Sequence, residues 1–240
     1  MSEPTQEIKK KKVSFSQYSM YMKCPYSWKL NYLEGKRIFD ATLNTCFGTA
    51  IHDSVQTFIK ALYTGGVSAA DSVNMFELFK TRFDEEISKE RGKDAKFEYT
   101  DEEYTDFVFD GEDIIKTFTS PKNRIKHFPS NKYEFIGVEF PLEMPIKNNV
   151  NFVGFVDIIL KEKNKEYYKI IDFKTSSSGW NSYMKEDESK IAQLHLYKSV
   201  YSKKFNVPLN SIEVEFFLSL IHISEPTRQA EISYAVFCLK

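Results

Sequence analysis

Hydrophobic residues recur at helical spacing through most of the first half of the chain. The pattern predicts three helices, over residues 49–63, 70–90 and 101–118. An aromatic-rich segment before them also has helical spacing, with Ser16 as a candidate N-cap and Gly35 as a candidate stop. Pro25 interrupts that segment, because proline lacks a backbone donor and disfavours helix at the preceding residue. We therefore expect two short helical pieces that meet at Cys24.

The second half of the chain changes to short runs rich in Ile, Val, Phe and Tyr, separated by polar turns. These runs predict strands over residues 133–146, 152–160, 167–174 and 212–217, with a helix over 189–205 before the last. The first three strands are expected to form an antiparallel meander. The pattern as a whole predicts one α/β domain with a helical front half.

Composition narrows the function classes. The chain has 240 residues, of which 42% are hydrophobic, so it can bury a core. With 33 basic and 34 acidic residues, it has no bulk attraction for a polyanion, and any nucleic-acid partner must be held by a local site. No stretch has the length or apolarity of a signal peptide or a membrane span, so we expect no membrane partner. Three cysteines without paired spacing favour a reducing, cytoplasmic location. Residues 1–12, which end in four lysines, are predicted to be a flexible basic tail.

The candidate chemistry lies in the predicted hairpin. In a strand, Asp172 and Lys174 share one face, while Phe173 points into the opposite layer. If the turn is centred on residues 164–165, residues whose numbers sum to 329 lie opposite one another, so Asp157 faces Asp172. Two carboxylates directly opposite are destabilising unless a cation lies between them. The pair therefore predicts a site for a hard divalent ion, with Lys174 placed to orient or help deprotonate a water.

The simplest alternative is a surface hairpin on which Asp172 and Lys174 form a solvated pair, because the Asp-x-Lys triplet is common. Other residues change that balance. His52 follows Gly48 by one turn at a predicted helix start. Gln193 and Tyr197 are four residues apart, and so lie on one face of the predicted helix.

Taken in order, these motifs are Ser-x-x-x-Tyr followed by Cys-Pro and Trp, then Gly-x-x-x-His, Gly-x-x-Asp, Asp-Phe-Lys-Thr and Gln-x-x-x-Tyr. As a set they are similar to the RecB-like branch of the PD-(D/E)XK nuclease superfamily, which also contains CRISPR-associated exonucleases and many phage proteins. The resemblance covers residues 15–217. It implies a restriction-endonuclease-like core, with a mixed sheet and an antiparallel hairpin flanked by helices.

The resemblance also implies roles for individual residues. His52, Asp157 and Asp172 would bind Mg²⁺ or Mn²⁺ with the backbone carbonyl of Phe173, and the imidazole tilts the preference toward Mn²⁺. Lys174 would be catalytic, and two residues of the later helix, Gln193 and Tyr197, would steady the active site. Glu139 matches a recurrent acidic position of unassigned role.

The implied activity is hydrolysis of DNA phosphodiester bonds in phage or bacterial replication, recombination or repair, in the cytoplasm of the cell or host. The expected substrate is single-stranded DNA or DNA with single-stranded ends, on whose bases Trp180 and Tyr183 are candidates to stack. Ordinary packing of Trp180 is the alternative. A second reading of the whole chain is a catalytically impaired nuclease fold that only binds nucleic acid or a protein partner.

Cys24 is a candidate ligand of a [4Fe–4S] cluster, because some members of this branch hold one with an early cysteine and three later ones. The later three are not in this sequence, and Cys46 does not match the pattern. Four thiolates are the usual requirement. The cluster is therefore expected only if further sequence supplies the missing cysteines.

Residues 218–240 differ in character from the rest of the chain. One choice of codons for residues 218–228 reproduces a widely used transposase sequencing adapter, and one for residues 232–239 reproduces a flow-cell primer site. We therefore expect the nuclease-like domain to occupy residues 13–217 and to be truncated at its C-terminus, with residues 218–240 translated from adapter. Independent genomic coverage across codon 218 tests this hypothesis.

Overall fold

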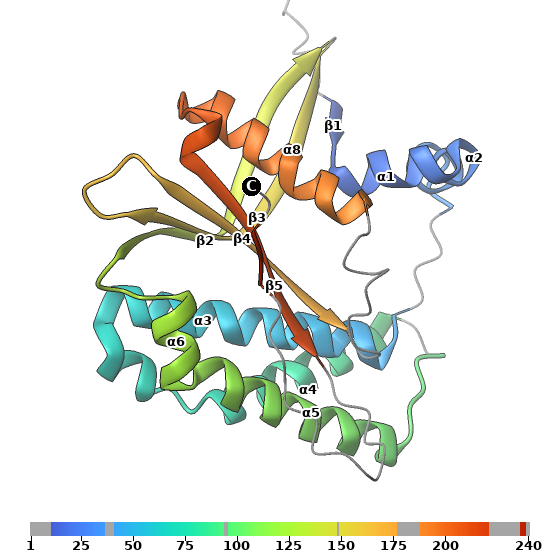
Figure 1. Ribbon diagram of the computed structural model, residues 1–240. Coiled ribbons are helices and arrows are strands. Elements are labelled where there is room, and N and C mark those ends of the chain that lie inside the picture. The colour runs from blue at the N-terminus through green and yellow to red at the C-terminus, as the bar shows by residue number, and fades with distance from the viewer. Residues whose placement is uncertain are drawn as a thin grey trace, which may run out of the picture.

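A mixed sheet separates two helical layers in the computed structural model, which describes residues 11–36, 41–93, 96–147, 149–176, 188–220 and 236–238 (Figure 1). Strand β3 is central: β2 pairs with it antiparallel along its length, and the remaining order is β1-β3-β4-β5-β6. The strands are β1 (Lys11–Val13), β2 (Tyr133–Lys147), β3 (Val150–Glu162), β4 (Tyr168–Ser176), β5 (Ile212–Leu220) and β6 (Val236–Cys238). The predicted α/β class with an antiparallel meander is confirmed.

The register of the predicted hairpin is also confirmed. Ile158 pairs with Ile171, and the pairing continues to Lys161 with Tyr168, so the residue numbers of each pair sum to 329. Strand β5 then pairs with β4 in parallel, with Asp172 beside Phe216. The parallel neighbour makes the sheet mixed and leaves β4 buried between β3 and β5.

The N-terminal boundary differs from the prediction. Lys11 and Lys12 were expected in a flexible tail, but with Val13 they form β1, which pairs in parallel with the start of β3. Lys12 also forms an ion pair with Glu143 of β2 at 3.6 Å. Residues 1–10 lie outside the described residues.

Two short helices follow β1, and they meet at Cys24 as predicted. They are α1 (Phe15–Lys23) and α2 (Pro25–Trp28), continued by the π-helical turn η1 (Lys29–Leu33). The N-cap of α1 is Ser14 rather than Ser16: its side chain accepts a hydrogen bond from the Gln17 backbone N–H. Ser16 is instead an exposed residue of the first turn.

Four helices cover one face of the sheet: α3 (Leu43–Asp71), α4 (Met75–Lys93), α5 (Asp101–Thr119) and α6 (Pro121–His127) (Figure 1). A capping box between Thr42 and Thr45 starts α3 six residues before its predicted start, so Gly48 lies inside the helix rather than at its beginning. Gly66, at φ 80°, kinks α3 near its end. Helix α3 extends to Asp71, so residues 70 and 71 belong to it. The helix predicted from residue 70 therefore begins later, at Met75, as α4. Helix α5 matches its prediction within one residue, whereas the short α6 was not predicted.

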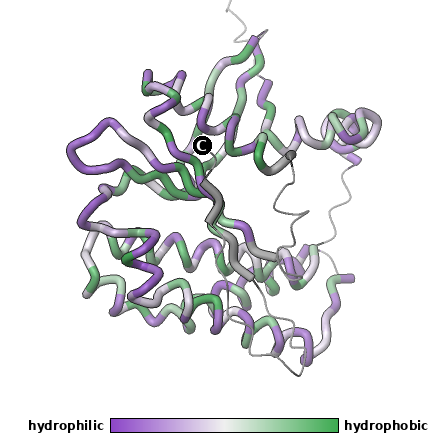
Figure 2. Tube along the Cα trace, in the orientation of Figure 1, coloured by the Kyte–Doolittle hydropathy of each residue, from purple (hydrophilic) through white to green (hydrophobic). Residues whose placement is uncertain are grey.

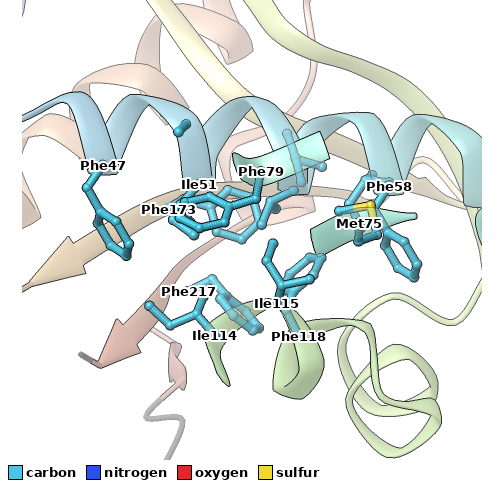
Figure 3. Close-up of a cluster of buried hydrophobic side chains, with 14 of the residues drawn as sticks. Phe47, Ile51, Phe58, Met75, Phe79, Ile114, Ile115, Phe118, Phe173 and Phe217 are labelled. Atoms are coloured by element: carbon cyan, nitrogen blue, oxygen red, sulfur yellow. The ribbon is translucent and has the colours of Figure 1, made fainter. Parts of the chain in front are cut away.

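The other face of the sheet is covered by α8 (Glu188–Phe205), as predicted within one residue (Figure 1). Hydrophobic side chains fill both interlayer spaces, and the hydrophilic positions gather at exposed sites such as the β3–β4 hairpin tip (Figure 2). Phenylalanines dominate the core under α3, where Phe173 of β4 and Phe217 of β5 meet Phe118 of α5 (Figure 3). Phe173 therefore points away from α8, as the strand alternation predicted.

A buried charged group lies within β5, beside Ile171 of β4. Glu215 is 1% exposed and is held by Lys169 and by His127 of α6. Burial raises the pKa of Glu215, but the His127 hydrogen bond and the Lys169 charge outweigh it and lower the pKa below its usual range. The fold therefore keeps this carboxylate ionised.

Two further observations concern the helices and the C-terminal strands. No helix among the described residues is both long enough and apolar enough to cross a membrane. The backbone of β5 continues past Phe217 to Leu220, and β6 pairs with it antiparallel. The adapter origin of residues 218–240 and the domain limits at residues 13 and 217 stay predictions.

Candidate active site

The two long strands β2 and β3 lose their regular alternation at the same level of the sheet. On β3, Val156 packs in the core under α8, yet Ile158 packs in the core under α3. Their β2 partners show the same change, with Phe140 on the α8 side and Val138 on the α3 side. One residue on each strand therefore lies between the two packing arrangements. These residues are Glu139, between Val138 and Phe140, and Asp157, between their partners Ile158 and Val156.

The backbone at Glu139 accounts for the change. Its φ is 44°, in the left-handed region that a residue with a Cβ rarely adopts. Such strain persists only where the surrounding structure holds it, and it is concentrated at functional sites. The distortion brings an acidic side chain of β2 to the position where β3 carries another.

Asp157 itself ends the regular pairing of β3 with β4. Its Oδ2 accepts a 2.6 Å hydrogen bond from the backbone N–H of Phe173. The ladder ends one pair earlier, at Ile158 with Ile171, so Asp157 and Asp172 do not form the ladder pair that the register predicted. Burial and the neighbouring charge of Asp172 raise the pKa of Asp157 to about 7, although the Phe173 N–H and Lys174 act in the opposite direction. This carboxylate is thus poorly stabilised by the protein alone, as expected of a group that awaits a cation.

His52 reaches the same place from α3. Its Nδ1 is 3.9 Å from Asp157 Oδ2, and its ring packs edge-on against Phe173. Burial lowers the pKa of His52, against the opposite effect of Asp172, so the imidazole is neutral and can offer a lone pair. One donor atom each from His52, Glu139 and Asp157 lie within 4.8 Å of one another.

Gln56, one turn after His52 on α3, was not singled out from the sequence. The residue is buried, and its Nε2 donates a 2.7 Å hydrogen bond to Oε1 of Glu139. The spacing of four residues between His52 and Gln56 on one helix was the available signal. Its partner is 83 residues away, which no local pattern reveals.

A second group of side chains adjoins these three. Asp172 is 4% exposed, and its Oδ2 lies 2.8 Å from Lys174 Nζ. Lys174 in turn lies 3.5 Å from Oε1 of Gln193, whose Nε2 donates to the Tyr197 hydroxyl at 3.0 Å. The predicted common face of Gln193 and Tyr197 is confirmed. Burial alone lowers the pKa of Lys174, but the charge and hydrogen bond of Asp172 raise it overall, so the ammonium stays protonated.

Gly154, in the predicted Gly-x-x-Asp motif, has a packing role. A Cβ on this residue would lie 2.8 Å from Cε1 of Tyr197 and 3.2 Å from the ring of Phe152. Only glycine lets the tyrosine approach β3 this closely. Gly154 therefore lets Tyr197 of α8 pack directly against β3, the strand that carries Asp157.

Other predicted residues are placed elsewhere or not described. Cys24 is exposed, and its Sγ accepts a hydrogen bond from the Ser27 N–H at 3.4 Å, whereas Cys46 is a buried residue of α3. Around Cys24, the described residues assemble no group of three metal-binding side chains, so the iron–sulfur cluster stays a prediction. Trp180 and Tyr183 lie outside the described residues.

The donor set suits a hard divalent cation. Carboxylates with one imidazole are typical ligands of Mn²⁺ and acceptable to Mg²⁺. The cationic Lys174 beside them suits an anionic substrate. An imidazole, several carboxylates and a fixed lysine at the end of a β-hairpin can together act on a phosphodiester.

A family model decides the assignment: the model of the PD-(D/E)XK nuclease superfamily matches residues 12–234. The chain belongs to the PD-(D/E)XK nuclease superfamily. Its Asp172-Phe173-Lys174 triplet has the D-x-K form of the superfamily name. None of the curated proteins matches the chain.

A solved structure agrees with this PD-(D/E)XK fold. The crystal structure of a Eubacterium rectale protein with the provisional name exonuclease is similar, with a TM-score of 0.56 and 12% sequence identity. The likeness covers 99% of this chain and 76% of that one. At this identity the likeness shows a shared fold, and the nuclease assignment rests on the superfamily match.

Proposed function

We propose that the protein is a divalent-metal-dependent nuclease that hydrolyses DNA phosphodiester bonds. The observation that carries the proposal is the convergence of His52, Glu139 and Asp157, from three separate elements, beside the Asp172–Lys174 ion pair. Two carboxylates close to each other and to an imidazole, with a third carboxylate next to them, are unfavourable without a cation. Superfamily membership supplies the chemistry that such a cation would serve.

The proposed ligands are His52, Asp157, Asp172 and the Phe173 carbonyl, with Glu139 as a further ligand. A bound Mg²⁺ or Mn²⁺ supplies Lewis acidity toward the phosphate and toward the attacking water. Asp157 is also held by the Phe173 N–H, so its orientation is fixed before any ion binds. This preorganisation limits the cost of assembling the centre.

Lys174 is proposed to stabilise negative charge on the phosphate oxygens. Its raised pKa favours this cationic role over the alternative of accepting a proton from water. Gln193, 3.5 Å from the ammonium, limits its movement, and Tyr197 holds Gln193 in turn. The role proposed for these two residues is positioning.

The test is hydrolysis of labelled single-stranded and duplex DNA with Mn²⁺, with Mg²⁺ and with EDTA. Asp172→Asn and Lys174→Met should each lower the rate at least about 100-fold, because the first removes a proposed metal ligand and the second removes the cation that faces the reacting phosphate. Asp106→Asn, at an exposed carboxylate on the outer helix α5, is the matched control and should cleave like the parent. Parental rates for both site variants would exclude the proposed catalytic centre.

The alternative function, a nuclease fold that binds nucleic acid without cleaving it, makes a different prediction. It requires DNA binding with no hydrolysis under any metal condition. An RNA oligonucleotide of the same sequence tests the proposed preference for DNA.

A further inference from the structure

Helices α1 and α2 expose an unusual number of aromatic side chains. Tyr21 is 48% exposed and Tyr26 is 66% exposed, and among the residues of α1, α2 and η1 only Phe15 is buried. Large exposed apolar groups that gather on one small unit commonly mark a binding surface. Tyr21 is held in place by an edge-to-face contact with Trp28 at 5.5 Å between ring centroids.

The same segment is positively charged, although the chain as a whole is not. From residue 11 to residue 33 there are four lysines and no aspartate or glutamate, against a net charge of −1 for all 240 residues. Lys12 and Lys29 form ion pairs with Glu143 and Glu34, which lie outside that range. Lys23, at the end of α1, is exposed and has no ion-pair partner among the described residues. Lysines interleaved with exposed tyrosines complement a ligand that combines phosphates with planar bases.

A cavity lies between α1, α2 and α8 and reaches the candidate active site through Gln193, although Tyr21 and Tyr26 do not line it. It has a volume of about 500 Å³, and its lining includes Ser16, Ser19 and Lys23 of α1, Ser27 of α2 and Gln193 of α8. Gln193 is the residue that contacts Lys174. Hydroxyl groups and an ammonium suit the phosphate backbone. A strand bound in this cavity along α1 would therefore pass Gln193, next to Lys174.

We propose that α1 and α2 bind a single-stranded stretch of DNA next to the scissile bond, with Tyr21 and Tyr26 stacking on bases and Lys23 contacting a phosphate. The inference rests on the proposed nuclease function and adds its substrate form. Single strands are specified because their bases are free to stack on tyrosine, whereas a duplex presents stacked pairs and backbone.

The experiment measures fluorescence anisotropy of a labelled 12-nucleotide oligo(dT), and of a duplex of the same length, in EDTA. The double variant Tyr21→Leu/Tyr26→Leu should bind oligo(dT) at least about tenfold more weakly, from the usual contribution of base–aromatic stacking. Duplex affinity should change by less than about twofold. Tyr21→Phe/Tyr26→Phe keeps both rings and should bind like the parent. Phe109→Ala, at an equally exposed aromatic on α5, is the matched control and should bind like the parent.

Hydrolysis of bis(p-nitrophenyl) phosphate separates the two proposals, because this small diester needs only the reaction centre. The leucine double variant should hydrolyse it like the parent. If the parent fails to hydrolyse it, the nuclease proposal fails. The binding measurement in EDTA needs no hydrolysis and still tests the single-strand binding surface. Unchanged oligo(dT) affinity in the leucine variant overturns the stacking surface, and so does an equal loss for duplex and single strand. If this face binds a protein partner instead of DNA, the leucine variant should bind oligo(dT) with the affinity of the parent.

Discussion

Gln56→Met is the most informative single substitution in the site. Methionine matches glutamine in length and volume but cannot donate the 2.7 Å hydrogen bond to Glu139. The change therefore releases Glu139 without opening a cavity in the core around α3. If Gln56 positions a metal ligand, the variant should fold like the parent and bind metal more weakly.

The expected magnitude follows from the contact. A hydrogen bond to a charged acceptor contributes about 1.5–3 kcal/mol, and it here restrains a side chain on a left-handed backbone, φ 44°. Loss of a residue that orients a metal ligand typically weakens metal affinity about 10- to 100-fold. We expect a loss of that size in a Mn²⁺ titration followed by the EPR signal of free Mn²⁺. Gln17→Met, at a glutamine of α1, is the matched control.

A double-variant cycle isolates the interaction. Glu139→Gln should itself weaken Mn²⁺ binding, and adding Gln56→Met should then cost much less than it does alone, because the two residues act as one unit. Parental Mn²⁺ affinity in Gln56→Met would refute the positioning role. Fully additive losses would show that Gln56 acts elsewhere than on Glu139.

Three further predictions follow from packing and charge. Gly154→Ala should lower the free energy of unfolding by about 1–3 kcal/mol and reduce DNA hydrolysis, since its Cβ would displace Tyr197. Chemical denaturation and rate assays measure the two effects. Parental values for both would show that Tyr197 accommodates the added methyl group without cost. Because the fold lowers the pKa of Glu215, this residue should stabilise the protein above its ordinary pKa near 4.5, and the contribution should fade as the pH falls through the lower folded value. Glu215→Gln should cost about 3–5 kcal/mol near neutral pH and flatten that pH dependence, as measured by denaturation at pH 3–7; an unchanged profile would contradict this. Lys174→Met should slow hydrolysis while leaving oligonucleotide binding in EDTA within about threefold, since one phosphate contact among several is lost; a parallel collapse of binding would assign Lys174 to substrate capture instead.

The hairpin shows what the sequence could predict. Its register follows from turn position and strand period, which are local, and the pairing of Ile158 with Ile171 is as expected. The Gln193–Tyr197 hydrogen bond also follows from helical spacing within one element. Each of these depends on residues a few positions apart or joined by one turn.

The missed features depend on distant contacts. Nothing in the sequence near Glu139 indicates a left-handed backbone, because glycine is the usual signal for one and the residue is glutamate. The same limit applies to Gln56, whose partner is on another element, and to β1, whose three residues become a strand only by pairing with β3. The predicted metal ligands therefore did not include Glu139, although donor atoms of Glu139, His52 and Asp157 lie within 4.8 Å of one another.

The central claim, a divalent cation held by residues of α3 and the sheet, is tested most directly by a crystal structure of the protein with Mn²⁺, using the anomalous signal of the ion. We predict one strong peak in contact with His52 and Asp157, and within reach of the Glu139 and Asp172 carboxylates. A peak at another place in a crystal of active enzyme, or active enzyme with no peak between these residues, would contradict the account.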